Sequence, residues 1–204
     1  MDLSKAVYQL QKIKSLTPNT PLRLAAEWPK KWQILIATIL SAQTRDEVTI
    51  LVCEDLFKKY QGMKRLARAK PSDVEKIIRP VNYHKTKAKR IIETSKILQN
   101  KSIPKTLEEL IKLPGVGRKV ANVYLAEAHK ADAIGVDTHV ARISQKLGWT
   151  KNKDPHKIEK DLEKLFPREY WGKINDTLVR FGKTVGTSRA REDEVIEGVK
   201  MMEL

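Results

Sequence analysis

The stretch LPGVGRKVANV, residues 113–123, decides the fold of this chain. Pro114 begins a tight connection, and Gly115 and Gly117 are expected to allow backbone angles and close approaches that a Cβ would block. Apolar residues recur at helical spacing before and after this stretch, which predicts a helix, a tight turn and a second helix. Backbone N–H groups at the positive N-terminus of the second helix would form a place to hold a phosphate.

Two side chains near this turn are candidates for chemistry. Lys119 lies in the first turn of the second helix, and Asp137 follows a reversal expected around residues 132–135. A lysine and a carboxylate are therefore expected to converge beside a bound phosphate backbone. Turns of this kind also occur in purely structural helical hairpins, where such a lysine is only a solvated side chain. The motif alone leaves both interpretations open.

The charge of the chain favours a polyanionic partner. Its 204 residues contain 40 Lys and Arg against 25 Asp and Glu, which gives a formal net charge of +15. Such an excess attracts nucleic acid and gains from counterion release. The alternative is a lysine-rich surface kept for solubility or heat resistance.

The cysteine content excludes two classes of site. Cys53 is the only cysteine, so the chain has neither an intrachain disulfide nor a multi-cysteine metal site. The longest apolar run, residues 34–40, is too short to span a bilayer, and the first residues lack the apolar core of a signal peptide. We expect a soluble intracellular protein of the cytoplasm or nucleoid, monomeric by default.

Helical periodicity runs through almost the whole chain, and no segment alternates like a strand, so the expected fold class is all-α. A polar cluster at residues 41–46 joins two helices, and Thr44 or Asp46 is expected to cap the second. Residues 80–87 are expected to form a loop. Its Tyr83, among basic residues, suits stacking on bases, although a loop tyrosine is more often a partly buried anchor.

Five ordered segments of the chain resemble the endonuclease III group of the helix-hairpin-helix DNA glycosylases. They are SAQTRD (41–46), PVNYHKTK (80–87), LPGVGRKVAN (113–122), VDTH (136–139) and WGKIN (171–175). The resemblance implies a six-helix barrel domain over residues 24–134, with the hairpin at about 106–129. A second helical domain would combine residues 1–23 and 135–204. Double-stranded DNA with a damaged base or an abasic site would bind between them, with the nucleotide rotated out of the stack.

The same resemblance assigns roles to individual residues. Lys119 stands at the catalytic lysine position and would attack C1′ of the damaged nucleotide, forming a Schiff base that permits β-elimination. Asp137 would stabilise positive charge on the sugar and help to deprotonate the lysine. Gln43 would fill the gap left by the nucleotide, and Tyr83 would wedge the opposite strand. The full set of implied DNA-binding residues is Gln43, Asp46, Tyr83, Lys87, Gly115, Val116, Gly117 and Arg118.

The chain departs from most of this family in its C-terminal region. Most members hold a [4Fe–4S] cluster with four cysteines there, and cluster ligation requires thiolates. Gly186 stands at the first of these positions, so we expect no iron–sulfur cluster and no other cofactor. The one ion that the resemblance suggests is a monovalent cation on carbonyls of the hairpin. A helix over about residues 189–202 is expected to replace the cluster. Asn82 is a smaller departure, since the family usually has glycine beside the wedge.

The function implied by the resemblance is a bifunctional DNA glycosylase and AP lyase acting on oxidised pyrimidines such as thymine glycol. An 8-oxoguanine glycosylase would use the same lysine and aspartate and is the alternative within the enzyme class. A non-catalytic, damage-binding protein is the alternative from another class. A monofunctional adenine or mismatched-thymine glycosylase is disfavoured, because those relatives typically lack the lysine.

Overall fold

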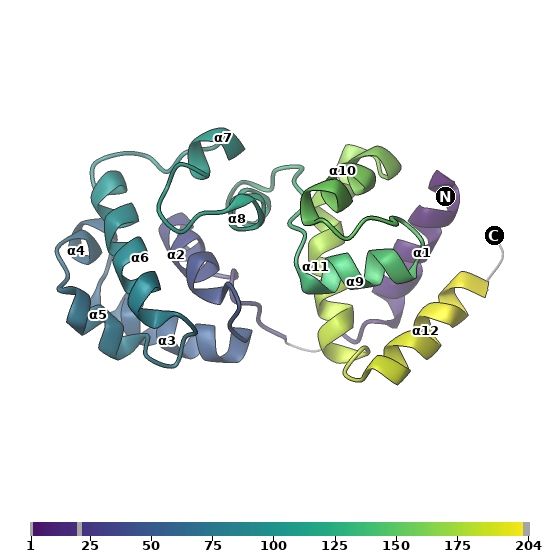
Figure 1. Ribbon diagram of the computed structural model, residues 1–204, viewed down its shortest axis with the longest axis horizontal. Coiled ribbons are helices and arrows are strands. Elements are labelled where there is room, and N and C mark those ends of the chain that lie inside the picture. Colours follow the sequence, from purple (N-terminus) through teal and green to yellow (C-terminus); the bar gives the residue numbers. More distant parts are fainter. Residues whose placement is uncertain (1, 20–21, 202–204) are drawn as a thin grey trace. The chain divides into compact units, whose positions relative to one another are not determined.

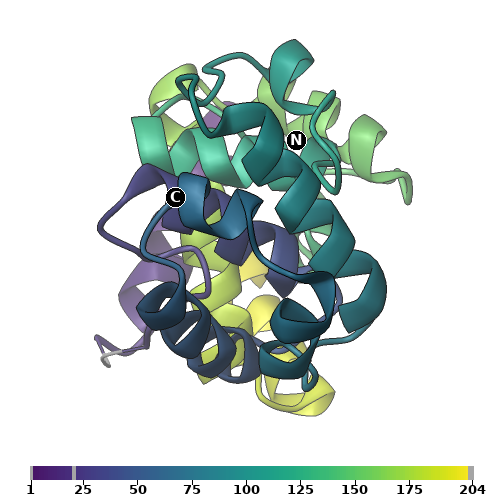
Figure 2. The ribbon, with the colours of Figure 1, turned by 90° about the vertical axis from the view of Figure 1, so that its left-hand side faces the viewer.

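A computed structural model describes residues 2–19 and 22–201 of the chain. Over these residues it contains twelve α-helices and no strand. The ribbon is drawn from two directions in Figures 1 and 2. The predicted all-α fold class is confirmed. Over the same residues, no helix is both long enough and apolar enough to cross a membrane.

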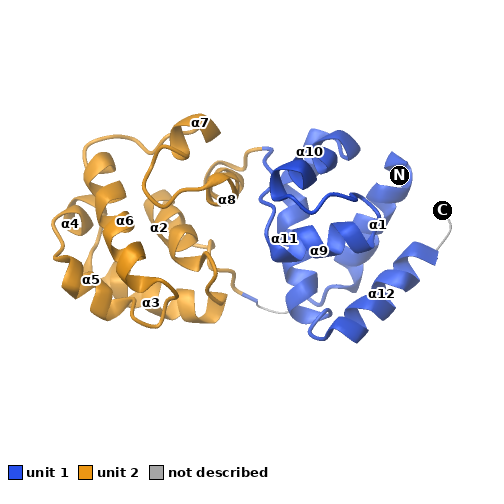
Figure 3. Ribbon diagram, in the orientation of Figure 1, with its two compact units in different colours: residues 1–22, 132–204 blue, residues 23–131 orange. Residues whose placement is uncertain are grey.

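The chain divides into two compact units (Figure 3). Unit 1 combines the two ends of the chain, residues 1–22 and 132–204, and unit 2 is the continuous segment 23–131. The functional domains implied by the resemblance, 24–134 and 1–23 with 135–204, stay predictions. Residues 1, 20–21 and 202–204 of those ranges lie outside the described residues.

Unit 2 is organised around one buried helix. Its helices are α2 (Lys31–Ser41), α3 (Asp46–Lys59), α4 (Met63–Ala67), α5 (Pro71–Ile77), α6 (His84–Leu98), α7 (Leu107–Leu110) and α8 (Arg118–His129). Every residue of α2 from 34 to 40 is buried, and α2 packs against α3, α6 and α8 (Figure 1). A helix that is apolar on all sides has to be covered on all sides, which explains why α2 is central.

Unit 1 packs around a long helix near the end of the chain. Its helices are α1 (Leu3–Leu16), α9 (Thr138–Lys146), α10 (Pro155–Leu165), α11 (Arg168–Thr184) and α12 (Arg189–Met201). Helix α11 contacts α1, α9 and α10, and α1 also contacts α12. The core includes Ile143, Phe181 and Ile196, each almost completely buried. Helix α1 therefore packs with the C-terminal helices as part of unit 1.

Two local expectations are wrong. Helix α6 begins at His84, so Lys87 lies in its first turn and not in a loop. The N-cap of α3 is Arg45, which makes no side-chain capping bond, and the hydroxyl of Thr44 accepts hydrogen bonds from residues near α6. Thr44, which the local pattern predicted as a cap of α3, therefore bonds to residues that are distant in sequence.

Candidate functional site

The hairpin turn before α8 depends on one glycine. Gly115 has φ +81°, a left-handed backbone that residues with a Cβ rarely adopt. A Cβ there would lie 3.1 Å from both Arg90 Cδ and Ile39 Cγ2. Thr94 Oγ1 also donates a hydrogen bond of 2.8 Å to the carbonyl of Pro114. These contacts fix the turn against α6 and α2.

Gly117 does not have the unusual backbone angles or close contacts that the sequence predicted for it. It is the exposed N-cap of α8 with φ −87° and ψ 174°, and a Cβ there would have nothing within 4 Å. The expectation that Gly117 is needed for its backbone angle or for a close approach within the chain is wrong. Val116 is buried, and its N–H donates to the carbonyl of Leu113 at 3.1 Å, so that amide is already used by the turn.

Lys119 is the second residue of α8 and is half-buried, directly after Arg118. Glycine at the N-cap has no side chain to accept hydrogen bonds from the first-turn amides of α8. The N-terminus of a helix carries a partial positive charge. The exposed end of α8 therefore offers backbone donors and an amine side by side, an arrangement suited to an anion.

Asp137 is the N-cap of α9, and its Oδ1 accepts a hydrogen bond of 2.9 Å from the N–H of Val140. The carboxylate is half-buried and held in one place by this bond. Lys119 belongs to unit 2 and Asp137 to unit 1, so their convergence at one site stays a prediction.

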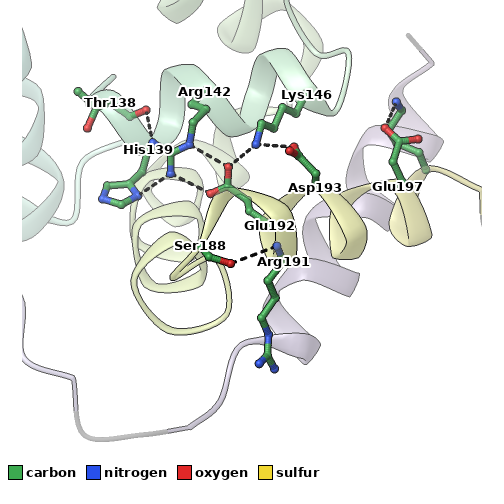
Figure 4. A network of polar contacts seen from close by, with 10 residues as sticks. Thr138, His139, Arg142, Lys146, Ser188, Arg191, Glu192, Asp193 and Glu197 are labelled. Atoms are coloured by element: carbon green, nitrogen blue, oxygen red, sulfur yellow. Dashed lines mark hydrogen bonds and ion pairs between the residues drawn. The ribbon is translucent and has the colours of Figure 1, made fainter.

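A network of charges links α9 to α12 within unit 1 (Figure 4). Glu192, 1% exposed, receives two hydrogen bonds of 2.8 Å from Arg142 and one of 2.7 Å from Lys146. Lys146 also pairs with Asp193 at 2.6 Å. Burial opposes the charged carboxylate, but the bonds from Arg142 and Lys146 outweigh it and lower the pKa of Glu192 to about 2.

His139 has a structural setting next to this network. Its Nδ1 lies 3.3 Å from Arg142 Nη2 and would be only 2.2 Å from a Cβ added to Gly182. Burial lowers the pKa of His139; Asp137 acts in the opposite direction, while Arg142 and Lys183 lower it further. The ring of His139 fills a space that exists because residue 182 is glycine.

The C-terminal region does not fit an iron–sulfur cluster. The resemblance implies that Gly186 stands where the first cysteine would be, and a Cβ at Gly186 would lie 2.8 Å from Glu192 Oε2. The side chain that closes this space is thus a carboxylate held by two cations. Cys53 is buried in α3 of unit 2, where burial raises the pKa of its thiol. Within the described ranges, no group of three or more His, Cys, Asp and Glu could hold a metal ion.

The other predicted DNA-binding residues gather at the C-terminal end of α2. Gln43 and Tyr83 are exposed and have φ values of 56° and 58°. They are two of the three non-glycine residues with positive φ in the described part of the chain. Tyr83 is 67% exposed, so it is not a buried loop anchor. Asp46 begins α3 and is half-buried.

Lys87, expected among the DNA contacts, instead has its ammonium inside the protein. It is 5% exposed, and its Nζ donates to the carbonyls of Leu40 and Ala42 and to Thr44 Oγ1. The ammonium of Lys87 is therefore directed at these protein oxygens and does not face a phosphate.

Unit 2 also has a hollow of about 600 Å³ that holds none of the predicted site residues. Lys31 Nζ lies 3.4 Å from His129 Nδ1, so the beginning of α2 is beside the end of α8. Gly115, just before α8, lies beside Ile39 near the end of α2, so the two helices run antiparallel. The hollow is lined there by Lys31, Trp32, Lys64, Lys105, Tyr124 and His129, among others. It is thus at the opposite end of α2 from residues 41–46.

Sequence reasoning missed Glu192 and the bonding roles of Asn82 and Thr44. Glu192 shares helical spacing with the apolar residues Ile196 and Val199, and a carboxylate on the apolar face of a helix is a signal for a buried ion pair. Asn82 and Thr44 are short polar residues in turns, and no sequence pattern pairs them across 38 positions.

The sequence of this chain is similar to those of known DNA repair proteins. Residues 36–168 match the model of the HhH-GPD superfamily base excision DNA repair protein. Endonuclease III of Thermotoga maritima is 46% identical over 157 residues, covering 76% of this chain and 74% of the relative. Endonuclease III of Synechocystis is 39% identical, covering 87% and 82%.

Solved structures give the same result. A trapped endonuclease III–DNA covalent intermediate superimposes with a TM-score of 0.82 at 32% identity, covering 90% of this chain and 87% of that one. A thermostable thymine-DNA glycosylase has a TM-score of 0.81 at 18% identity, covering 94% and 92%, which is a likeness of fold alone.

Proposed function

This chain belongs to the HhH-GPD superfamily of base excision DNA repair proteins and, within it, to the endonuclease III group, and from that premise we propose that its substrates are oxidised pyrimidines of the thymine glycol type. It is a DNA glycosylase and AP lyase that binds damaged duplex DNA. We further propose that it works on DNA inside the cell, that Lys119 is the nucleophile and that Asp137 assists it.

The position of Lys119 is the observation that carries the proposed mechanism. It lies one residue after the start of α8, beside the exposed N-cap Gly117. A phosphate bound by the first-turn amides would hold the DNA backbone next to this amine. A nucleotide rotated out of the stack from that backbone would bring its C1′ within reach of Lys119.

The reaction then proceeds by nucleophilic catalysis. The lone pair of Lys119 Nζ attacks C1′, and the bond from C1′ to the base breaks, with its electrons leaving on the base, which takes up a proton. The attacking nitrogen then loses a proton, and its lone pair opens the C1′–O4′ bond. O4′ takes up a proton, which leaves a protonated Schiff base. Loss of a proton from C2′ forms the C2′–C3′ double bond and expels the 3′ phosphate. Water hydrolyses the Schiff base and releases the lysine.

Asp137 is suited to an electrostatic role. Its carboxylate is fixed by the bond from Val140 N–H, so it would need little reorganisation as positive charge develops on the sugar. The proposed roles are stabilisation of that charge and assistance in removing a proton from Lys119. The hairpin amides at Gly115 and Gly117 and the side chain of Arg118 would contact the DNA backbone.

We also propose that the protein works without an iron–sulfur cluster. The steric overlap of a Cβ at Gly186 with Glu192 supports this, because the space of the first ligand is filled by an ion-paired carboxylate. Helix α12 would stabilise this region in place of the cluster, through Ile196 and Val199 in the core and Glu192 in the network. Iron analysis of anaerobically purified protein tests this, and stoichiometric iron would refute it.

The proposed activity is tested by borohydride trapping. The protein is mixed with duplexes that carry thymine glycol, 8-oxoguanine or an abasic site, and a covalent complex is sought after reduction. We expect trapping on thymine glycol and on the abasic site, and none with Lys119→Gln. Trapping on 8-oxoguanine but not on thymine glycol would change the substrate class. Binding without trapping on any duplex would leave a damage-binding protein.

A further inference from the structure

The buried ammonium of Lys87 joins two segments that are far apart in the sequence. Lys87 lies in the first turn of α6, and its Nζ is 2.7 Å from the carbonyl oxygen of Leu40 and 2.5 Å from that of Ala42. These carbonyls lie at the end of α2, where a helix has unsatisfied acceptors and partial negative charge. A third bond of 3.2 Å reaches Thr44 Oγ1. Lys87 therefore caps α2 from outside that helix.

Asn82 makes a second bridge between the same segments. Its backbone N–H donates to Thr44 Oγ1 at 3.2 Å, and its side-chain Nδ2 donates to the carbonyl of Gln43. A glycine at position 82, which the family usually has there, would keep the backbone bond to Thr44 and lose the side-chain bond to Gln43. We name the group formed by Lys87, Asn82 and Thr44 the Lys87 clamp.

The clamp surrounds two strained, exposed residues. Gln43 and Tyr83 both have left-handed backbones although neither is glycine, a conformation that persists only when surrounding contacts impose it. Gln43 stands between Ala42 and Thr44, which Lys87 binds, and Tyr83 directly follows Asn82. The N–H of Lys87 also donates to the carbonyl of Tyr83 at 2.9 Å. The clamp thus fixes the backbone on both sides of Gln43 and at Tyr83.

We propose that Lys87 is a positioning residue, whose clamp presents Gln43 and Tyr83 to the duplex as one preformed, two-pronged wedge. This deepens the proposed function and rests on the roles that the resemblance implies for these residues: Gln43 in the gap left by the nucleotide and Tyr83 against the opposite strand. A rigid wedge requires less ordering on binding than two independent loops. Burial lowers the pKa of Lys87 to about 8, because the ammonium is withdrawn from water.

Two variants and a matched control test the proposal. Lys87→Met keeps an unbranched, apolar stem and removes the charge and all three donors. Asn82→Gly removes only the side-chain bridge to Gln43. Lys89→Met is the control, because Lys89 is an exposed lysine on the same helix and its loss changes the net charge equally. Thermal unfolding identifies any variant that fails to fold, in which case Asn82→Gly carries the test.

The first readout compares two substrates in single-turnover trapping: an abasic site in a duplex and the same site in a single strand, which has no complementary strand to separate. Lys87→Met should lower the duplex rate about 10- to 100-fold more than the single-strand rate, because misplaced groups mainly affect steps that require their alignment. Asn82→Gly should shift the ratio in the same direction, and Lys89→Met should not shift it. An equal loss on both substrates, or no loss, would overturn the proposal.

The second readout needs no catalysis. A duplex with a tetrahydrofuran abasic analogue opposite 2-aminopurine reports unstacking of the opposite base through increased fluorescence. Wild type and Lys89→Met should give the same increase at saturating protein, and Lys87→Met a smaller one. Equal increases for all three would refute the wedge. Failure of the proposed function is distinguishable, because it appears as no covalent adduct with wild-type protein while this fluorescence readout still decides the role of Lys87.

Discussion

Arg142 and Glu192 form a two-point ion pair, with Nε to Oε1 and Nη2 to Oε2 both at 2.8 Å. The pair joins α9, whose N-cap is the proposed catalytic Asp137, to α12, which follows the expected cluster position. The buried carboxylate thus connects the last helix of the chain directly to the element that carries Asp137. Removal of this carboxylate should lower the stability of unit 1.

Glu192→Gln should destabilise the protein. It would leave Arg142 and Lys146 facing a neutral partner, but these side chains keep 32% and 25% of their surface exposed, so water screens part of the loss. We expect about 2–3 kcal/mol, below the value for a fully buried pair. Urea unfolding measures it. Glu197→Gln is the control, because its pair with Lys200 is exposed and should contribute less than about 0.5 kcal/mol. Equal effects of the two changes would contradict this account.

The same ion pair predicts a pH dependence. The pKa of Glu192 is about 2 in the folded protein and about 4.3 for an unperturbed Glu. Because the folded pKa is the lower one, the stabilisation is complete above the unfolded value and is lost as pH falls toward the folded one. The difference in unfolding free energy between wild type and Glu192→Gln should therefore shrink as pH falls from 5 toward about 2.5. A constant difference would show that the carboxylate charge is not responsible.

Two glycines of the C-terminal region should respond oppositely to alanine. Gly182→Ala would place a Cβ 2.2 Å from His139 Nδ1, in a packed site, and should cost about 1–3 kcal/mol. Gly198→Ala, in α12 with nothing within 4 Å, should stabilise by about 0.5–1 kcal/mol because glycine is a poor helix former. Thermal unfolding of both variants checks the signs. A tolerated Gly182→Ala would mean that His139 can move aside freely.

Alanine substitution at the two hairpin glycines should lower stability at one position and DNA affinity at the other. Gly115→Ala forces a side chain into a left-handed backbone against Arg90 and Ile39 and should cost about 1–3 kcal/mol of stability. Gly117→Ala should leave stability nearly unchanged, because its backbone is ordinary and its surroundings are open. It should weaken binding to a duplex with an abasic analogue, since the new methyl group would stand at the proposed phosphate site. Unchanged affinity in a folded Gly117→Ala protein would move the phosphate elsewhere.

Asp137 can be tested without disturbing the helix that it caps. Asparagine is also a good N-cap, so Asp137→Asn should retain the bond to Val140 N–H and the stability of unit 1. Base removal should nevertheless fall by about 10²- to 10⁴-fold if the charge assists the reaction. Asp137→Ala should show the same catalytic loss and, in addition, lose about 1 kcal/mol of stability. Full activity of Asp137→Asn would limit the residue to capping.

The sequence by itself determined the helices, the hairpin and the family. Helical periodicity and Pro–Gly punctuation are local signals, and they located α2, α8 and α11 to within a few residues. The matching segments were short and ordered, so they identified Lys119 and Asp137 as candidates without any structure. The single cysteine, visible from composition, gave the expectation of a chain without a cluster.

Only the tertiary structure decided which polar side chains face inward and what they bind. Lys87 was predicted to contact DNA, but its ammonium is buried and bonds to backbone carbonyls. Glu192 was one acidic residue among several in the sequence, and in the structure it is the centre of a network of ion pairs. The sequence suggested that the turn needs glycine at position 117, but Gly117 has backbone angles that any residue adopts and open space around it. The reason is physical: hydrogen bonds and ion pairs depend on groups brought together from distant positions, and only the packing of the helices determines those encounters.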